Sequence, residues 1–242
     1  DPPAFRTVQP HLLEQARFSS KMWRIVAGDH PLTFLGLECH GYSHRPPMAQ
    51  EKPRLRWLAY GSSITTGNGA THLQHGYVQQ AAMRLRADVW NKGLPGACMC
   101  EREVADFLSE RVEWEMVTLE IGVNMRSSVP PNEFAERVEY LIGRMTAIQP
   151  AKPVVVITGF PNFCTYEIKE TVSGINERKY NEILRRIVKD ADDPNLLLAE
   201  GTDILTEFGG LTADLIHPSD AGHALMGENL GNLLLSRLSS HK

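Results

Sequence analysis

The sequence contains few residues that could crosslink or anchor the chain. Only four of its 242 residues are cysteine, and their spacing matches neither a zinc ribbon nor a disulfide framework. No apolar run approaches the roughly 20 residues that cross a membrane, and the basic residues form no stripe of the kind that binds nucleic acid. We therefore expect neither a membrane nor a nucleic-acid partner. We interpret all four cysteines as buried or free thiols: Cys39, Cys98, Cys100 and Cys164.

The remaining composition is that of an ordinary globular protein. The formal net charge is −4, and 42% of the residues are hydrophobic, which suffices for one large domain or two modest ones. The opening residues, Asp1-Pro2-Pro3, lack the basic and apolar regions of an intact signal peptide and could be a processed or truncated end. The compartment stays open, with a cytoplasmic protein favoured and a secreted one as the alternative. Oligomeric state also stays open.

The first 53 residues differ from the rest of the chain in composition and in the pattern of apolar and turn-forming residues. Residues 5–8, 22–26 and 32–38 have the composition of short strands, and turn-forming residues separate them. Residues 43–53 are rich in proline and charge, which is typical of an extended linker. We predict that residues 1–53 are a small β-rich unit, which could be the remnant of a β-sandwich. It would precede a main domain at residues 54–242.

From residue 55 onward, apolar runs of strand length alternate with amphipathic helical patterns. This alternation predicts right-handed crossovers and a parallel sheet covered on both faces. The expected fold class is a three-layer α/β/α domain with about five parallel strands. The expected strands are residues 55–60, 88–91, 116–121, 153–158 and 196–199, and the expected helices are residues 77–86, 101–113, 133–148, 177–189 and 220–238.

Candidate functional residues follow four of the five expected strands, and the last of these sets also precedes the final helix. In an open parallel sheet these positions meet at one edge, where ligands bind. Ser63 stands in a sharp turn after the first strand. Gly96 closes a glycine turn after the second, and Asn124 follows the third. Asp214 and His217 lie on one short turn after the fifth.

These residue types fit together as the parts of an acyl-transfer site. A serine hydroxyl needs a base to take its proton, and a histidine needs an acidic partner to fix its tautomer. Ser63, His217 and Asp214 could supply these three groups. The reaction also needs donors for the oxyanion, and the N–H groups of Ser63 and Gly96 with the amide of Asn124 are the candidates.

The same residues resemble the SGNH, or GDSL-type, serine hydrolases. Four sequence blocks match that family in order: Gly61-Ser62-Ser63-Ile64-Thr65, Asn91-x-Gly93-x-x-Gly96, Gly122-x-Asn124 and Asp214-x-x-His217-Pro218. The resemblance implies a flavodoxin-like SGNH fold. It also implies that Ser63 is the nucleophile, that Gly96 and Asn124 donate to the oxyanion, and that His217 is the base, which Asp214 orients.

The chain departs from the family pattern at two positions. The family usually has aspartate where this chain has Ser62, and again where it has Met125. Neither missing carboxylate is the acid of the triad. Met125 would make the pocket near the third strand more apolar, so we predict that it binds substrate. Phe160 and Asn162, in the loop after the fourth strand, are the other predicted substrate contacts.

Three further histidines need an interpretation. The pair His72 and His75 has an H-x-x-H spacing, but no carboxylate or cysteine lies near it in the sequence. We interpret the pair as part of a loop at the pocket mouth and predict no metal site. His223 falls inside the last expected helix and is interpreted as structural.

The sequence thus predicts a serine esterase that hydrolyses short-chain carboxylic esters, such as O-acetyl esters, without a cofactor. The β-rich N-terminal unit resembles the arrangement in certain two-domain carbohydrate acetyl esterases and in some acyltransferases related to them. This resemblance implies a small-molecule substrate with a short acyl group on a sugar, as in an acylated carbohydrate, or on a polyketide-like alcohol. One alternative is an acyltransferase with a non-water acceptor, and a second is a catalytically silent carbohydrate-binding module. A third is a metal-dependent phosphoesterase that uses His72, His75 and Asp214.

Overall fold

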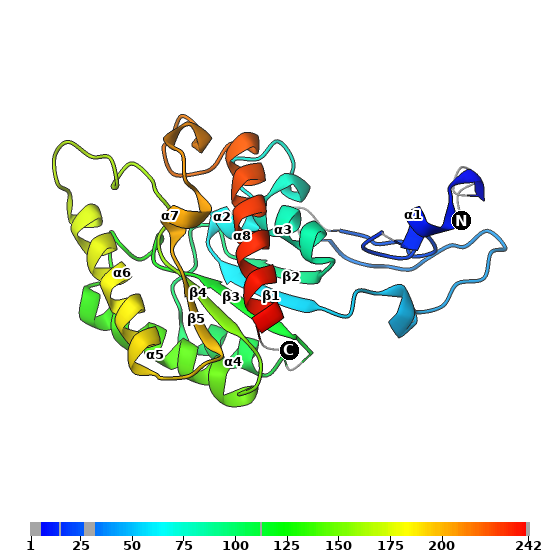
Figure 1. Cartoon of the computed structure of the whole chain (residues 1–242), viewed down its shortest axis with the longest axis horizontal. Helices are drawn as coiled ribbons and strands as arrows, with labels where there is room; N and C mark the ends of the chain where they lie inside the picture. Colours follow the sequence, from blue (N-terminus) through cyan, green and yellow to red (C-terminus); the bar gives the residue numbers. More distant parts are fainter. Residues whose placement is uncertain (1–5, 15, 27–31, 112, 241–242) are drawn as a thin grey trace.

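A five-stranded parallel sheet forms the centre of the molecule (Figure 1). The computed structural model describes residues 6–14, 16–26, 32–111 and 113–240. The strand order is β2-β1-β3-β4-β5, and every neighbouring pair is parallel. The strands are β1 (Arg56–Gly61), β2 (Asp88–Gly93), β3 (Met116–Glu120), β4 (Val154–Ile157) and β5 (Leu196–Ala199). The predicted fold class and the existence of all five strands are confirmed.

Helices connect the strands and cover both faces of the sheet, with α3 and α8 on one face and α4, α5 and α6 on the other (Figure 1). The five predicted helices are present, and their observed bounds differ from the predicted ones most at the start of α6. The described α-helices are α1 (Pro10–Glu14), α2 (Ser63–Thr66), α3 (Tyr77–Leu85), α4 (Arg102–Ser109), α5 (Pro131–Ile148), α6 (Val172–Asp190), α7 (Gly201–Ile204) and α8 (Asp220–Ser240). Short 3-10 helices are η2 (Ala49–Glu51), η3 (Leu73–His75) and η4 (Phe208–Gly210).

The sheet separates two apolar cores, because successive residues of a strand face opposite sides. In β1, Leu58 and Tyr60 pack into the core beneath α4, α5 and α6, whereas Trp57 and Ala59 pack into the core beneath α3 and α8. All four side chains are at most 1% exposed. Burial on both faces explains why the strands read as nearly continuous apolar runs.

Helix α8 packs closely on α3, and glycine makes the approach possible. A Cβ atom on Gly227 would lie 2.3 Å from the Cβ of Gln80 and 3.1 Å from the carbonyl oxygen of Tyr77. Any side chain at this position would push the two helices apart. Because α8 begins three residues after His217, its packing also fixes where the preceding turn lies.

The N-terminal region corrects the sequence prediction. The part of it that the structure describes contains no strand, so the strands predicted at residues 22–26 and 32–38 are wrong, and residues 6–8 are not extended either. Residue 5 lies outside the described residues. A strand needs a partner to satisfy its backbone groups. Most of this segment extends away from the sheet (Figure 1), and Arg17 contacts the main domain by donating to the carbonyl oxygen of Ala87, just before β2. Trp23 and Leu35 are 88% and 92% exposed. The division of the chain near residue 53 stays a prediction.

Candidate active site

Ser63 lies where the first strand turns sharply into a short helix. β1 ends at Gly61, and Ser62 caps α2 by accepting the Ile64 N–H at its Oγ, 3.1 Å away. Ser63 is therefore the first residue of α2 and is 7% exposed. A Cβ on Gly61 would lie 2.1 Å from Thr65 Oγ1, so this sharp turn requires glycine. The local sequence thus holds one hydroxyl rigidly at the edge of the sheet.

A buried carboxyl group, Glu120, lies beneath this turn, and the sequence analysis did not identify it. Glu120 Oε2 accepts hydrogen bonds from the Ser62 N–H (2.7 Å), the Ser62 hydroxyl (2.7 Å) and the Thr65 hydroxyl (3.0 Å). Burial raises the pKa of the Glu120 carboxyl, although the hydrogen bonds from Ser62 and Thr65 oppose that shift. The one feature of the sequence that could have indicated Glu120 is its position as a single acidic residue at the end of an otherwise apolar strand.

His217 and Asp214 continue from Ser63 as a chain of short hydrogen bonds. The Ser63 Oγ lies 2.8 Å from His217 Nε2, and His217 Nδ1 lies 2.6 Å from Asp214 Oδ2. An ionised carboxylate can only accept, so Nδ1 carries the proton and Nε2 is left to accept the hydroxyl proton of Ser63. The structure therefore brings together the three residues predicted from the sequence, across a separation of 154 residues between Ser63 and His217.

Asp214 is held in place by its own turn. Its Oδ1 accepts hydrogen bonds from the N–H groups of Ile216 (2.8 Å) and His217 (2.9 Å) and from the hydroxyl of Thr212 (2.8 Å). Partial burial raises the pKa of the Asp214 carboxyl, but these bonds and the one from the His217 ring outweigh it and hold that pKa well below its usual range. Asp214 thus stays ionised and keeps His217 oriented. The side chains of His217 and Asp214 are 26% and 48% exposed, whereas Ser63 is 7% exposed.

Two of the three predicted oxyanion donors, Gly96 and Asn124, lie on the loops after β2 and β3, and the third, the Ser63 N–H, lies at the start of α2. Gly96 adopts a left-handed conformation with a φ of 68° in the first of these loops. The side-chain Oδ1 of Asn124 accepts the Cys98 N–H at 3.1 Å, which leaves its Nδ2 hydrogens as the donors. Cys98 belongs to the same loop as Gly96, so this hydrogen bond ties the two donor loops together. β1 and β3 are neighbours at the point where the strand order reverses, which is where open α/β sheets bind ligands.

Asn91 joins the second matched block to α2, the helix that begins with Ser63. Its Nδ2 donates to the carbonyl oxygen of Thr65 at 2.6 Å, and its Oδ1 accepts the Gly93 N–H at 2.9 Å. A Cβ on Gly93 would lie 2.4 Å from the Thr66 backbone nitrogen, so β2 and α2 approach closely here. These two residues of the block therefore position α2 on the sheet.

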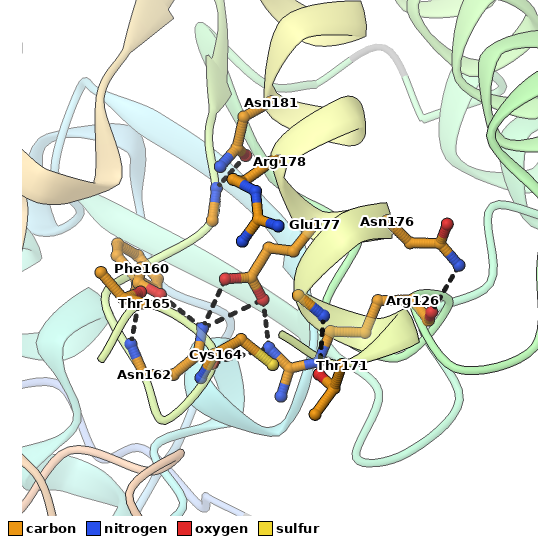
Figure 2. Close-up of polar contacts among 12 residues, drawn as sticks. Arg126, Phe160, Asn162, Cys164, Thr165, Thr171, Asn176, Glu177, Arg178 and Asn181 are labelled. Carbon is orange, nitrogen blue, oxygen red and sulfur yellow. Dashed lines mark hydrogen bonds and ion pairs between the residues drawn. The ribbon is translucent and has the colours of Figure 1, made fainter. Parts of the chain in front are cut away.

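The three predicted substrate contacts are inside the protein, which corrects that prediction. Met125 is 0% exposed, and Phe160 and Asn162 are 4% and 3% exposed. The Asn162 amide is also fully engaged, because its Nδ2 donates to Glu177 and to the Phe160 carbonyl and its Oδ1 accepts from Arg126 (Figure 2). Position after a strand placed these residues near the site, but sequence could not show that their side chains point inward.

His72, His75 and Asp214 do not gather into a metal site. Asp214 holds His217, whereas His75 Nδ1 lies 3.8 Å from Asp220 Oδ1, and the rings of His72 and His75 contact edge to face. Across the described part of the chain, no group of three or more His, Cys, Asp or Glu side chains could hold a metal ion. Nor is any helix in that part of the chain long and apolar enough to cross a membrane.

The profile of the GDSL-like Lipase/Acylhydrolase family matches residues 59–225, a range that contains every residue of the site above. The chain belongs to the GDSL-like lipase/acylhydrolase family. The resemblance inferred from the four sequence blocks is thereby confirmed. A search of the curated proteins found no match.

Solved structures with the same fold include members of this family and esterases. A GDSL-like lipase from Bacteroides ovatus has a TM-score of 0.66 at 22% identity, over 78% of this chain and 55% of its own. The salicylyl-acyltransferase SsfX3 from a tetracycline biosynthetic pathway has a TM-score of 0.63 at 15% identity, over 76% and 55%. A family two carbohydrate esterase from Cellvibrio japonicus has a TM-score of 0.62 at 15% identity, over 78% and 63%. This chain thus spans about half the length of the first two structures.

Proposed function

We propose that this GDSL-family chain is a serine esterase that hydrolyses short-chain carboxylic esters through an acyl-enzyme. The observation that carries the proposal is the continuous hydrogen-bond path from the Ser63 hydroxyl through both nitrogens of His217 to Asp214, with distances of 2.8 and 2.6 Å. This is the arrangement that general-base activation of a serine requires. No metal or organic cofactor enters the proposed chemistry.

In the proposed first step, His217 Nε2 takes the Ser63 proton as Oγ attacks the ester carbonyl carbon. Negative charge develops on the carbonyl oxygen, where the N–H groups of Ser63 and Gly96 and the Nδ2 of Asn124 stabilise it. The imidazolium then gives its proton to the departing alcohol, and the acyl group stays on Ser63. His217 then takes a proton from a water molecule that attacks the acyl carbon, and it returns this proton to Ser63 Oγ as the bond from Oγ to the acyl carbon breaks and the acid leaves.

The exposure of His217 supports hydrolysis over transfer to another alcohol. A transferase must keep water away from its acyl-enzyme, whereas the side chain of His217, the base that would deprotonate this water, is 26% exposed, with Ser63 itself 7% exposed. The runner-up is nevertheless an acyltransferase, because SsfX3 has the same fold and transfers a salicylyl group according to its name. The carbohydrate esterases of this fold motivate O-acetylated sugars as the substrate class to test first.

The test is a panel of aryl esters of increasing chain length, followed by acetylated sugars, assayed with and without added alcohols. We expect turnover to be fastest with acetate esters and to yield free acid in both conditions. Ser63→Ala should abolish turnover while circular dichroism and melting temperature stay close to wild type. Full activity in that variant would end the proposal, and acyl transfer to the added alcohol in preference to water would favour the transferase.

A further inference from the structure

A buried polar cluster of three side chains lies between two loops of the active site, away from the reacting atoms. It consists of Arg126, Asn162 and Glu177, and we refer to it as the buried polar cluster. We propose that this cluster is a positioning device that holds the turn of Asn124 and the turn of His217 in fixed relation to one another. The inference rests on the proposed esterase function, because the cluster would fix the relative positions of the residues of that active site.

The cluster is fully connected and almost fully enclosed (Figure 2). Arg126 Nη1 donates to Asn162 Oδ1 at 2.9 Å and forms an ion pair with Glu177. The Asn162 Nδ2 donates to both carboxylate oxygens of Glu177, at 2.9 and 3.0 Å. The Arg126 and Glu177 side chains are only 6% and 12% exposed. All three groups therefore constrain one another.

On one side the cluster holds the turn that carries Asn124. Arg126 is two residues beyond Asn124, and its N–H donates to the carbonyl oxygen of Gly122 at 3.1 Å, which closes the turn. The Asn176 side chain donates to the Arg126 carbonyl oxygen at 2.9 Å, while Glu177 holds the guanidinium group. Helix α6 thus binds both the backbone and the side chain of Arg126 in this turn.

On the other side the cluster holds the turn that carries His217. Phe163 follows Asn162 directly, and its N–H donates to the carbonyl oxygen of Leu215 at 2.8 Å. The Arg126 guanidinium lies 4.9 Å from the centre of the Phe163 ring. Leu215 has a φ of 56°, a left-handed conformation that a leucine adopts only when its surroundings impose it. The Phe163 contact is one of the constraints on that residue, which stands between Asp214 and His217.

Stability alone is a poor explanation for such a cluster. The cost of removing two charges from water often exceeds the attraction between them, so apolar residues of similar volume can be as stabilising. What apolar residues cannot supply is the directionality of several hydrogen bonds that meet at fixed angles. A shift of about 1 Å in a catalytic group can cost about a hundredfold in rate. A buried network that spans both turns meets that geometric requirement.

The experiment separates positioning from stability by comparing Arg126→Met with the double variant Arg126→Met/Glu177→Gln. The single variant leaves a buried carboxylate unpaired, so we expect a drop of about 10 °C in melting temperature. The double variant has no unpaired charge and should recover most of that drop. Its kcat for 4-nitrophenyl acetate, measured per folded molecule, should nevertheless stay about 100-fold below wild type, with KM changed by less than about threefold.

Two further variants complete the design. Arg84→Met/Glu228→Gln removes a surface ion pair between α3 and α8 with an N–O distance of 3.3 Å, and it should leave kcat unchanged. Arg126→Lys keeps the charge and should fold, but it loses the planar geometry of the guanidinium. We expect its kcat to fall about tenfold.

The results distinguish the inference from the function on which it rests. If wild type turns over the ester in a Ser63-dependent way and the double variant or Arg126→Lys does so equally fast, the buried polar cluster is only structural and the inference is overturned. If wild type itself shows no Ser63-dependent turnover, the proposed esterase function fails and the inference fails with it. A recovered melting temperature with a lasting loss of kcat supports the inference.

Discussion

At the scale of single residues, the site depends on atoms whose roles follow from hydrogen-bond direction. Asp214 accepts at both carboxylate oxygens, so His217 must donate from Nδ1 and present Nε2 to Ser63. These residues could be predicted from sequence because their types and order carry the chemistry. Glu120 could not, since a buried acid under the Ser63 turn leaves no motif, and only the fold shows which donors surround it.

The first prediction concerns the orientation of the imidazole. Asp214→Asn should keep the turn folded but present a side-chain N–H in place of a carboxylate oxygen, which favours the wrong tautomer of His217. We expect kcat for 4-nitrophenyl acetate to fall by about 10³–10⁴-fold. Glu207→Gln, at an exposed carboxylate just before η4, is the matched control and should retain wild-type kcat. An Asp214→Asn enzyme within tenfold of wild type would argue against this role of the carboxylate.

At the scale of elements, periodicity and length predicted the strands and helices of the α/β part. The predictions failed where an element depends on residues beyond its own apolar pattern, such as a neighbouring strand or a capping residue. The segments at residues 22–26 and 32–38 have strand composition but no neighbouring strand in the described chain, so they stay unpaired. Helix α6 begins at Val172, earlier than expected, because Thr171 caps it by accepting the Gly174 N–H. The apolar pattern alone does not reveal that cap.

The second prediction uses two glycines in helices that differ in their surroundings. Gly227→Ala would place a Cβ 2.3 Å from that of Gln80, so α8 must move away from α3, and we expect the free energy of unfolding to fall by about 1–3 kcal/mol. Gly143→Ala in α5 meets nothing within 4 Å and should raise that free energy by up to about 1 kcal/mol. Urea unfolding measures both, and the same sign for the two variants would contradict the account of the α3–α8 contact.

At the scale of the whole molecule, strands that are far apart in the sequence place the residues of the site at one edge of the sheet. The order β2-β1-β3-β4-β5 makes β1 and β3 neighbours, so the turns of Ser63 and Asn124 lie next to each other. The strand ends could be predicted from alternation, and so could the edge where they meet. The inward direction of Met125, Phe160 and Asn162 could not, because it depends on how the loops fold over α6.

The third prediction links pH to global stability through His223, which joins α8 to the loop before α3. Its Nδ1 accepts the Tyr77 N–H and its Nε2 bonds to the Asn68 carbonyl oxygen, so the folded state holds a neutral ring. Burial lowers the pKa of His223. Below a pH of about 6.5, where an unfolded histidine gains a proton, the unfolded state binds more protons and stability must fall.

The measurement is the melting temperature between pH 8 and pH 5 for wild type and His223→Gln. The variant loses hydrogen bonds and should melt lower at pH 8, but its melting temperature should fall less steeply on acidification. Asp214 and Asp220 have lowered pKa values, so their stabilising contributions are lost only at more acidic pH. An equal slope in wild type and variant over this range would show that His223 does not couple pH to folding.

The most direct test of the central claim is to identify the residue that a fluorophosphonate modifies. Peptide mass mapping of the treated wild-type protein should find one adduct, on Ser63, because only a serine activated by His217 beside oxyanion donors attacks the phosphorus quickly. His217→Ala, which keeps Ser63 but removes its base, should react at least about 100-fold more slowly. No adduct on Ser63 in folded wild-type protein, or equal labelling in the His217 variant, would contradict the account.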